Sequence, residues 1–302
     1  MRRARMVITL FILVAITGGT FVVLPRAMTP AVISPLADVP QPAFAFPKFF
    51  LRSKNPEELR KKIQAVIGNT WKNYSVYVKD YTSNFSMGIN DTVIFTAASV
   101  NKIPILASLY YGVQNQEINL DQSLTLQASD IQDYGTGTIR YDPPGTVYSV
   151  KTLARLMMQQ SDNTAAYLLA NYVIGLDTIQ TLIAKWGLTQ TDMANNKTSN
   201  KDTELLLSKI VQGKVANAAY TQEMLAFLSQ SDFEDRLPAL LPKDTTVYHK
   251  TGNGVGVVHD VGIVRAGRTN YYIGILASDV TDEPDAVKKI ATISKLVFDY
   301  LR

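Results

Sequence analysis

Apolar residues recur with two different periods in the first half of the chain, and these periods separate helices from strands. The segment at 55–68 has a polar cap, a proline in its first turn, early acidic residues and a closing glycine, which is typical of a helix. Short apolar runs at 73–81 and 85–92, joined by Thr-Ser-Asn, predict two strands. Apolar residues at helical spacing follow Ser99, and Pro104 suits the first turn of that helix, where its missing N–H costs nothing.

The remaining pattern places a block of helices between two groups of strands. Strands joined by short turns pair antiparallel. Helices at the two ends of a chain can cover one face of a sheet while a helical block packs beside it. We therefore predict an α+β domain. The expected helices lie near 149–160, 163–173, 177–186, 201–212 and 219–229, the strands at 245–252, 256–266 and 270–279, and the last helix at 284–301.

The N-terminal residues predict the cellular localisation of the protein. Three of the first five residues are arginine, and an uncharged apolar run follows at 6–24, long enough to span a bilayer core of about 30 Å. We expect a single-pass signal anchor over 1–24 that holds an extracytoplasmic domain at the cell membrane. A cleaved signal peptide is the alternative, but a small-x-small site is absent just after this run. Frequent prolines over 25–54 predict an extended linker before a single domain at 55–302.

The amino-acid composition argues against several kinds of catalytic and binding site. The chain has no cysteine, which excludes a thiolate nucleophile and a disulfide. Its only histidines are His249 and His259, and no H-E-x-x-H segment is present, which argues against a zinc site. The net charge is +4 with dispersed basic residues, unlike a nucleic-acid-binding surface. We expect no metal, no cofactor and no nucleic-acid partner.

Ser99 and Lys102 are separated by one helical turn and should share a face. A serine hydroxyl is a poor nucleophile until a base takes its proton. Lys102 can be that base only when it is neutral, which burial and a second cation such as Lys250 would favour. On local sequence alone, the pair could equally be a helix cap followed by a solvated lysine.

Two further motifs favour the catalytic interpretation. Ser161-Asp162-Asn163 and Lys250-Thr251-Gly252 each occur once, and they follow the single Ser-x-x-Lys in this order. Together with a Pro-Pro-Gly-Thr turn at 143–146, these motifs make residues 55–302 resemble the class A β-lactamase-like family of serine hydrolases.

The resemblance implies a three-layer α/β/α fold. It has a five-stranded antiparallel sheet flanked by helices and an additional all-helical subdomain. It also implies an enzyme that forms an acyl-enzyme with β-lactams or with D-alanyl peptides. Asn253 would supply the second oxyanion N–H, Gly252 would leave room for substrate, and Tyr134 would stand at the rim. The implied catalytic residues are Ser99, Lys102 and Ser161, and the implied substrate-binding residues are Asn163, Lys250, Thr251, Gly252, Asn253 and Tyr134.

One departure from the family concerns the loop after Ser-Asp-Asn. Class A enzymes carry a Glu-x-x-Leu-Asn segment there, whose glutamate activates water. Here no glutamate lies between Asn163 and Thr203, and the stretch 188–203 holds only Asp192 and Asp202 as acids. We expect Asp202 to cap the next helix. We therefore expect acylation to be intact and deacylation to be slow.

Three alternatives remain open. A D-alanyl-D-alanine peptidase-like cell-wall enzyme fits the same motifs, as does a penicillin-binding sensor that acylates without turnover. A Ser-His-Asp esterase would need a G-x-S-x-G elbow, which is absent. His249 should point away from its neighbour Lys250 on a strand and be structural. For His259 and Asp260 we expect packing or a hydrogen bond.

Overall fold

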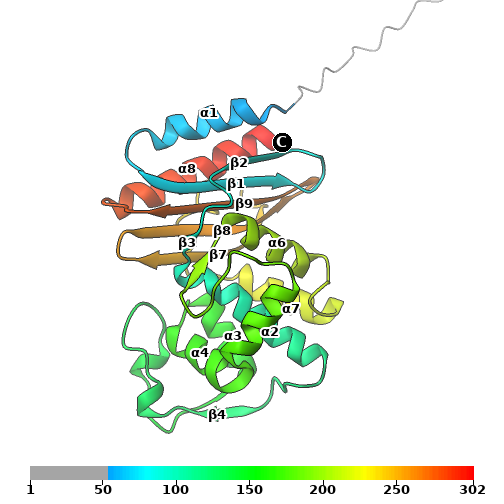
Figure 1. Ribbon diagram of the computed structural model, residues 1–302, viewed down its shortest axis with the longest axis vertical. Helices are drawn as coiled ribbons and strands as arrows, with labels where there is room; N and C mark the ends of the chain where they lie inside the picture. Colours follow the sequence, from blue (N-terminus) through cyan, green and yellow to red (C-terminus); the bar gives the residue numbers. More distant parts are fainter. Residues whose placement is uncertain (1–53) are drawn as a thin grey trace, which may run out of the picture. The chain divides into compact units, whose positions relative to one another are not determined.

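A five-stranded antiparallel sheet organises residues 54–302, the part of the chain that the computed structural model describes (Figure 1). The strand order is β2-β1-β9-β8-β7, which places β7 at an edge. β9 pairs with β8, its neighbour in sequence, and with β1 from the start of the domain, so the two ends of the domain meet in one sheet. The strands are β1 (Asn73–Asp80), β2 (Ser86–Ile89), β7 (Thr246–Gly254), β8 (Val257–Ala266) and β9 (Thr269–Ser278).

Two terminal helices cover one face of this sheet (Figure 1). They are α1 (Pro56–Ile67) and α8 (Glu283–Leu301). Asn55 caps α1 by accepting a hydrogen bond from the Glu57 N–H, and Gly68 ends the helix at a positive φ of 59°. Leu59 and Phe298 belong to the hydrophobic core between these helices and the sheet. Burial of this apolar face supplies the driving force for the layer.

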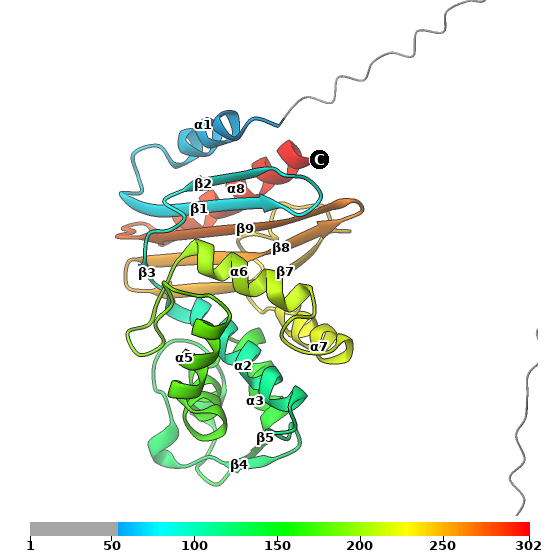
Figure 2. The same ribbon diagram turned by 45° about the vertical axis from the view of Figure 1, so that its right-hand side comes forward.

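The opposite side carries the helical part of the domain. α6 (Asn200–Val211) lies against β8 and β9, as Figure 2 shows, and completes three layers. α2 (Lys102–Gln114) runs through the centre of the helical part, where most of its side chains are buried. Against α2 pack α3 (Val150–Gln159), α5 (Leu176–Lys185) and α7 (Ala218–Leu228), whereas α4 (Asn163–Leu168) packs against α3.

The fold prediction is confirmed, and the main elements lie within one to three residues of their expected positions. The helix expected at 163–173 is α4 followed by a π-helical turn, Leu169–Ile174. Two small ladders were not predicted. They join β3 (Phe95–Thr96) to β6 (Lys197–Thr198) and β4 (Ser123–Thr125) to β5 (Val147–Ser149). Strands of two or three residues carry too little periodicity to be recognised in a sequence.

One helix cap differs from our expectation. Ser199, rather than Asp202, caps α6 by accepting a hydrogen bond from the Asp202 N–H. Asp202 instead lies in the first helical turn and is buried.

The N-terminal predictions stay predictions. The anchor at 1–24 and all but the last residue of the linker at 25–54 lie outside the described residues. Within residues 54–302, no single helix combines the length and the apolar character needed to cross a bilayer.

Candidate active site

Ser99 lies in a short 3₁₀ turn, Ala98–Asn101, that leads directly into α2. Its position just before a helix is the one that the sequence predicts. Ala98 has a positive φ of 48°, which is uncommon for a residue other than glycine and marks a strained backbone beside the serine. The Ala97 N–H donates to the backbone carbonyl of Asn196 at 2.8 Å, so a distant loop holds this turn in place.

Lys102 is buried, and its Nζ lies among four oxygen atoms. Ser99 Oγ is at 3.0 Å, the Ser161 carbonyl at 2.5 Å, Asn163 Oδ1 at 2.7 Å and Ser161 Oγ at 3.2 Å. A neutral amine has two N–H donors and one lone pair. The carbonyl of Ser161 and the amide oxygen of Asn163 can take the two donors. The lone pair is then free to accept the Ser99 proton.

The charge state of Lys102 supports this role. Burial lowers the pKa of Lys102 well below its usual value, and the nearby Lys250 lowers it further, whereas Asp162 opposes the shift. Both causes that we expected from the sequence are therefore present. A lysine with a lowered pKa is a competent general base near neutral pH.

Lys250 lies on β7 and reaches the same group of atoms from the sheet. Its Nζ donates to Ser161 Oγ at 2.9 Å and to the Thr251 carbonyl at 3.2 Å. Burial lowers the pKa of Lys250 to about 7; Asp260 opposes this shift and Arg236 adds to it. The Ser161 hydroxyl thus bridges the two lysines and provides a path for a proton between them.

The Ser161-Asp162-Asn163 segment is held by a loop that crosses it closely. Ser161 itself has a positive φ of 54°. Asp162 caps α4 and also accepts a hydrogen bond from the Ile139 N–H at 2.9 Å, so it is structural. Gly137 has a φ of 110°, and a Cβ there would lie 2.2 Å from Asp162 Oδ2. Only glycine allows the loop to approach this closely.

These residues surround a cleft of about 470 Å³. Tyr134 stands at its mouth with 63% of its surface exposed. No aspartate or glutamate belongs to the lining, which comes from the described part of the chain. Of the residues predicted from the sequence, the lining includes Ser99, Lys102, Ser161, Asn163, Thr251, Asn253 and Tyr134.

Two predicted residues lie behind the lining. Lys250 is buried beneath Ser161 and makes the contacts described above. Gly252 does not line the cleft; a Cβ there would lie 3.1 Å from the Ala97 carbonyl and 3.2 Å from Val100 Cγ2. The glycine therefore lets β7 pack against the Ser99 turn, and its predicted role of making room for substrate stays a prediction.

The two histidines make structural hydrogen bonds outside the cleft. The His259 ring lies 2.8 Å from the Thr96 carbonyl and accepts from the Ala277 N–H at 3.1 Å, and burial lowers its pKa to about 4. His249 lies 2.9 Å from Asp260; burial alone would lower the pKa of His249, but this carboxylate outweighs burial and raises it to about 9. Neither histidine is hydrogen-bonded to Ser99, so the esterase alternative has no support.

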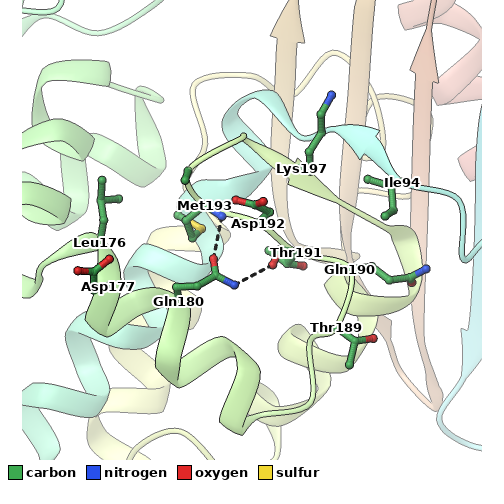
Figure 3. A pocket seen from close by; sticks show the side chains of 11 residues that line it. Ile94, Leu176, Asp177, Gln180, Thr189, Gln190, Thr191, Asp192, Met193 and Lys197 are labelled. Carbon is green, nitrogen blue, oxygen red and sulfur yellow. Dashed lines mark hydrogen bonds between the residues drawn. The ribbon is translucent and has the colours of Figure 1, made fainter.

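The loop at 188–199 contributes a residue that sequence reasoning missed. Asn196 is the single residue of this loop among those that line the cleft. Its side-chain oxygen accepts from Asn101 Nδ2 at 3.0 Å. Asp192 lines a separate pocket of about 530 Å³ (Figure 3). The Asn195 backbone N–H and side-chain amide donate to its two carboxylate oxygens at 2.9 and 2.8 Å. The Asp192 carboxylate therefore does not line the cleft in which a base would activate water beside Ser99.

Side chains from two helices fix the path of this loop. Gln180 on α5 accepts from the Met193 N–H at 2.9 Å and donates to the Thr191 carbonyl at 3.2 Å (Figure 3). Asp202 on α6 accepts from the Gln190 N–H at 2.7 Å and from the Thr191 hydroxyl at 2.9 Å. These contacts orient Asp192 outward and leave Asn196 in the wall of the cleft.

Comparison with known sequences identifies relatives of this arrangement. A family model described as the beta-lactamase enzyme family matches residues 58–301. A beta-lactamase of Bacteroides uniformis is 24% identical over 281 residues, which cover 83% of this chain and 94% of that protein. Beta-lactamase VEB-1 of Pseudomonas aeruginosa is 23% identical over 276 residues, which cover 81% of this chain and 90% of that protein.

Solved structures share the fold. A mutant of PBP-A, determined as an acyl-enzyme complex with penicillin G, superposes with a TM-score of 0.75 at 27% identity and covers 80% of this chain and 96% of that one. A beta-lactamase from Sphaerobacter thermophilus superposes with a TM-score of 0.76 at 22% identity and covers 81% of this chain and 96% of that one.

Proposed function

The chain belongs to the class A β-lactamase family of serine hydrolases, and from this premise we propose that β-lactams acylate Ser99 and that the acyl group is released from Ser99 slowly. In this mechanism Lys102 takes the proton of Ser99. Ser161, hydrogen-bonded to Lys250, delivers a proton to the nitrogen of the opened lactam. The acyl-enzyme of PBP-A with penicillin G supports a β-lactam as the acyl donor.

Slow release rests on one observation, the lack of a carboxylate in the lining of the cleft. Water attacks an ester slowly unless a base is positioned beside it, and loss of such a base typically costs about 10²–10⁴ in rate. Lys102 is the nearest substitute. It serves poorly once it carries the proton of Ser99 and while a substrate carboxylate near Lys250 favours its charged form.

A burst experiment tests this proposal. When the purified domain is mixed with excess penicillin, we expect a stoichiometric burst of product and then a slow steady state, because acylation outruns deacylation. Intact-mass spectrometry should show the adduct persisting over the same period. Rapid steady turnover without an accumulated adduct would contradict slow release, while the absence of any adduct and any turnover would contradict the β-lactam substrate itself.

A peptidase acting on D-alanyl peptides uses the same acylation groups, and the burst alone does not separate it from a penicillin-acylating sensor. A D-alanyl-D-alanine peptide supplied in the same assay does. Release of D-alanine would assign the peptidase activity. An adduct with penicillin and no release of D-alanine would assign the sensor.

We also propose that the domain is held outside the cytoplasm by an N-terminal membrane anchor. The arginines at the start of the chain and the apolar run at 6–24 support this orientation. Protease added to intact spheroplasts should digest residues 55–302 and leave a membrane-bound fragment. A domain that is protected in spheroplasts and cleaved only after lysis would place it in the cytoplasm.

A further inference from the structure

Two buried charged side chains on β7 and β8 lie outside the cleft. His249 Nδ1 lies 2.9 Å from one carboxylate oxygen of Asp260 and 3.1 Å from the other, and both residues are shielded from solvent. Asp260 also accepts a hydrogen bond from the Leu237 N–H at 3.0 Å, and Leu237 belongs to the hydrophobic core between the sheet and the terminal helices. The proposed acylation steps do not use this pair.

Two carboxylates hold His249 in its charged form. Burial lowers the pKa of His249, but Asp260 and then Glu234 outweigh burial and raise it to about 9. Glu234 Oε1 lies 3.5 Å from His249 Nε2, which has no hydrogen-bond partner within residues 54–302. Replacing a buried ion pair by apolar side chains is often neutral or stabilising, so stability alone does not account for these charges.

The same carboxylate lies near Lys250, which contacts Ser161 in the active site. Asp260 is paired in register with Thr251, the neighbour of Lys250, on the adjoining strand. Its negative charge opposes the loss of the Lys250 proton, whereas the buried Arg236 favours that loss. Charges buried in protein are screened much less than exposed ones, so these groups act on one another across the strands.

We propose that the negative charge of Asp260 acts on both His249 and Lys250, and that this pair sets the pH range over which Lys250 keeps its proton beside Ser161. His249 and Asp260 are positioning residues, because they act through Lys250 and do not line the cleft. The inference rests on the proposed function, in which Lys250 assists acylation of Ser99. The other charged groups around the pair are Glu234 and Arg236, both from the segment after α7, and Asp235, which pairs with Arg236 at the surface.

The pH dependence of acylation tests this coupling. With benzylpenicillin, the second-order rate constant of the full chain should fall on the alkaline side, near pH 7, as Lys250 loses its proton. His249→Asn keeps an N–H that can donate to Asp260 but removes the positive charge. Asp260 is then balanced by Lys250 and Arg236 alone, so the fall should move to higher pH by about one unit. Adding Asp260→Asn to this variant removes the negative charge as well, and the fall should return to lower pH.

Two control variants assign the shift to Lys250. Lys250→Arg carries a guanidinium that stays charged over this range, so the alkaline fall should disappear, and adding His249→Asn should not restore it. Asp232→Asn removes an exposed carboxylate from the segment that carries Glu234. Within residues 54–302, the carboxylates paired with His249 are those of Glu234 and Asp260, so the Asp232 variant should keep the unaltered profile.

Nitrogen-15 NMR of the two histidine rings gives a measurement that needs no β-lactam. At pH 7, His249 should have both ring nitrogens protonated, whereas His259, whose pKa burial lowers to about 4, should be neutral. Lys250→Arg keeps a cation near Asp260 at the pH where His249 titrates, so His249 should lose its proton at a lower pH than in the unaltered chain. Coupling between two sites is reciprocal, so this shift must accompany the one in the rate profile.

The outcomes distinguish this inference from the proposed function. A neutral His249 at pH 7 would overturn it, and so would a His249→Asn profile that keeps its position on the pH axis, whether at full or at uniformly reduced rate. If His249→Asn does not fold, the NMR shift in Lys250→Arg decides, and an unchanged titration of His249 there would overturn the coupling. If no penicillin acylates the unaltered chain while the NMR results hold, the proposed function is rejected and the coupled charges remain.

Discussion

Ser99→Ala is expected to abolish covalent labelling by a fluorescent penicillin. The Ser99 hydroxyl opens into the cleft and lies 3.0 Å from Lys102 Nζ, which can take its proton. Alanine leaves no oxygen at this position to form the ester. Gel fluorescence and intact mass should both show complete loss of the adduct, since a serine nucleophile has no partial substitute.

The variant should keep its fold. Lys102 loses one of its contacts but still donates to the Ser161 carbonyl at 2.5 Å and to Asn163 Oδ1 at 2.7 Å, so no buried polar group is left without a partner. Circular dichroism and the melting temperature should match those of the unaltered chain. Normal labelling would contradict the assignment and would point to Ser161, the other hydroxyl in contact with Lys102.

Lys102→Met is the control that separates the base from the nucleophile. The hydroxyl of Ser99 remains, so labelling should persist but slow by about 10²–10⁴. In the unaltered chain, the rate of acylation should rise with pH as Lys102 loses its proton, because only the neutral amine accepts one. The lowered pKa of Lys102 places this rise below the usual range of lysine. In Lys102→Met the rise should disappear.

The sequence predicts the centre of the site well because its residues are fixed by local geometry. Ser99 and Lys102 stand one turn apart at the start of a helix, and the contact between them follows from that spacing. Ser161 and Lys250 belong to short motifs at the end of a helix and on an edge strand. The order of elements then brings them together, and their hydroxyl and amine meet at 2.9 Å.

The wall and mouth of the cleft could not be predicted in the same way. Asn196, Phe233 and Val255 lie in loops or turns, whose paths depend on long-range contacts rather than on periodicity. Gln180 and Asp202 determine which side of the loop at 188–199 faces the cleft. The sequence of the loop itself does not predict that orientation. Asp192 illustrates the limit, since its residue type suits a base but its carboxylate lines the other pocket.

Asn196→Asp is expected to convert slow release into turnover. It supplies the missing carboxylate at the one position of the loop that lines the cleft. Asn196 has a positive φ of 49°, a conformation that asparagine and aspartate both tolerate. The two side chains have the same shape, so Asn101 Nδ2 can continue to donate to one oxygen while the other accepts a proton from water. A positioned base typically contributes about 10²–10⁴, and we expect deacylation to accelerate by about 10²-fold.

The measurement is the decay of the isolated penicillin adduct together with the steady-state rate, and both should rise while the burst shrinks. Asp192→Asn is the control within the same loop. It should leave acylation and deacylation unchanged, because the Asp192 carboxylate accepts hydrogen bonds from Asn195 and lines the neighbouring pocket rather than the cleft that holds Ser99. Two results would contradict this account of the loop. The first is that Asn196→Asp acylates normally but does not deacylate faster. The second is that Asp192→Asn deacylates more slowly than the unaltered chain. The second result would make Asp192 the water-activating base and show that the loop moves to bring its carboxylate to the acyl-enzyme.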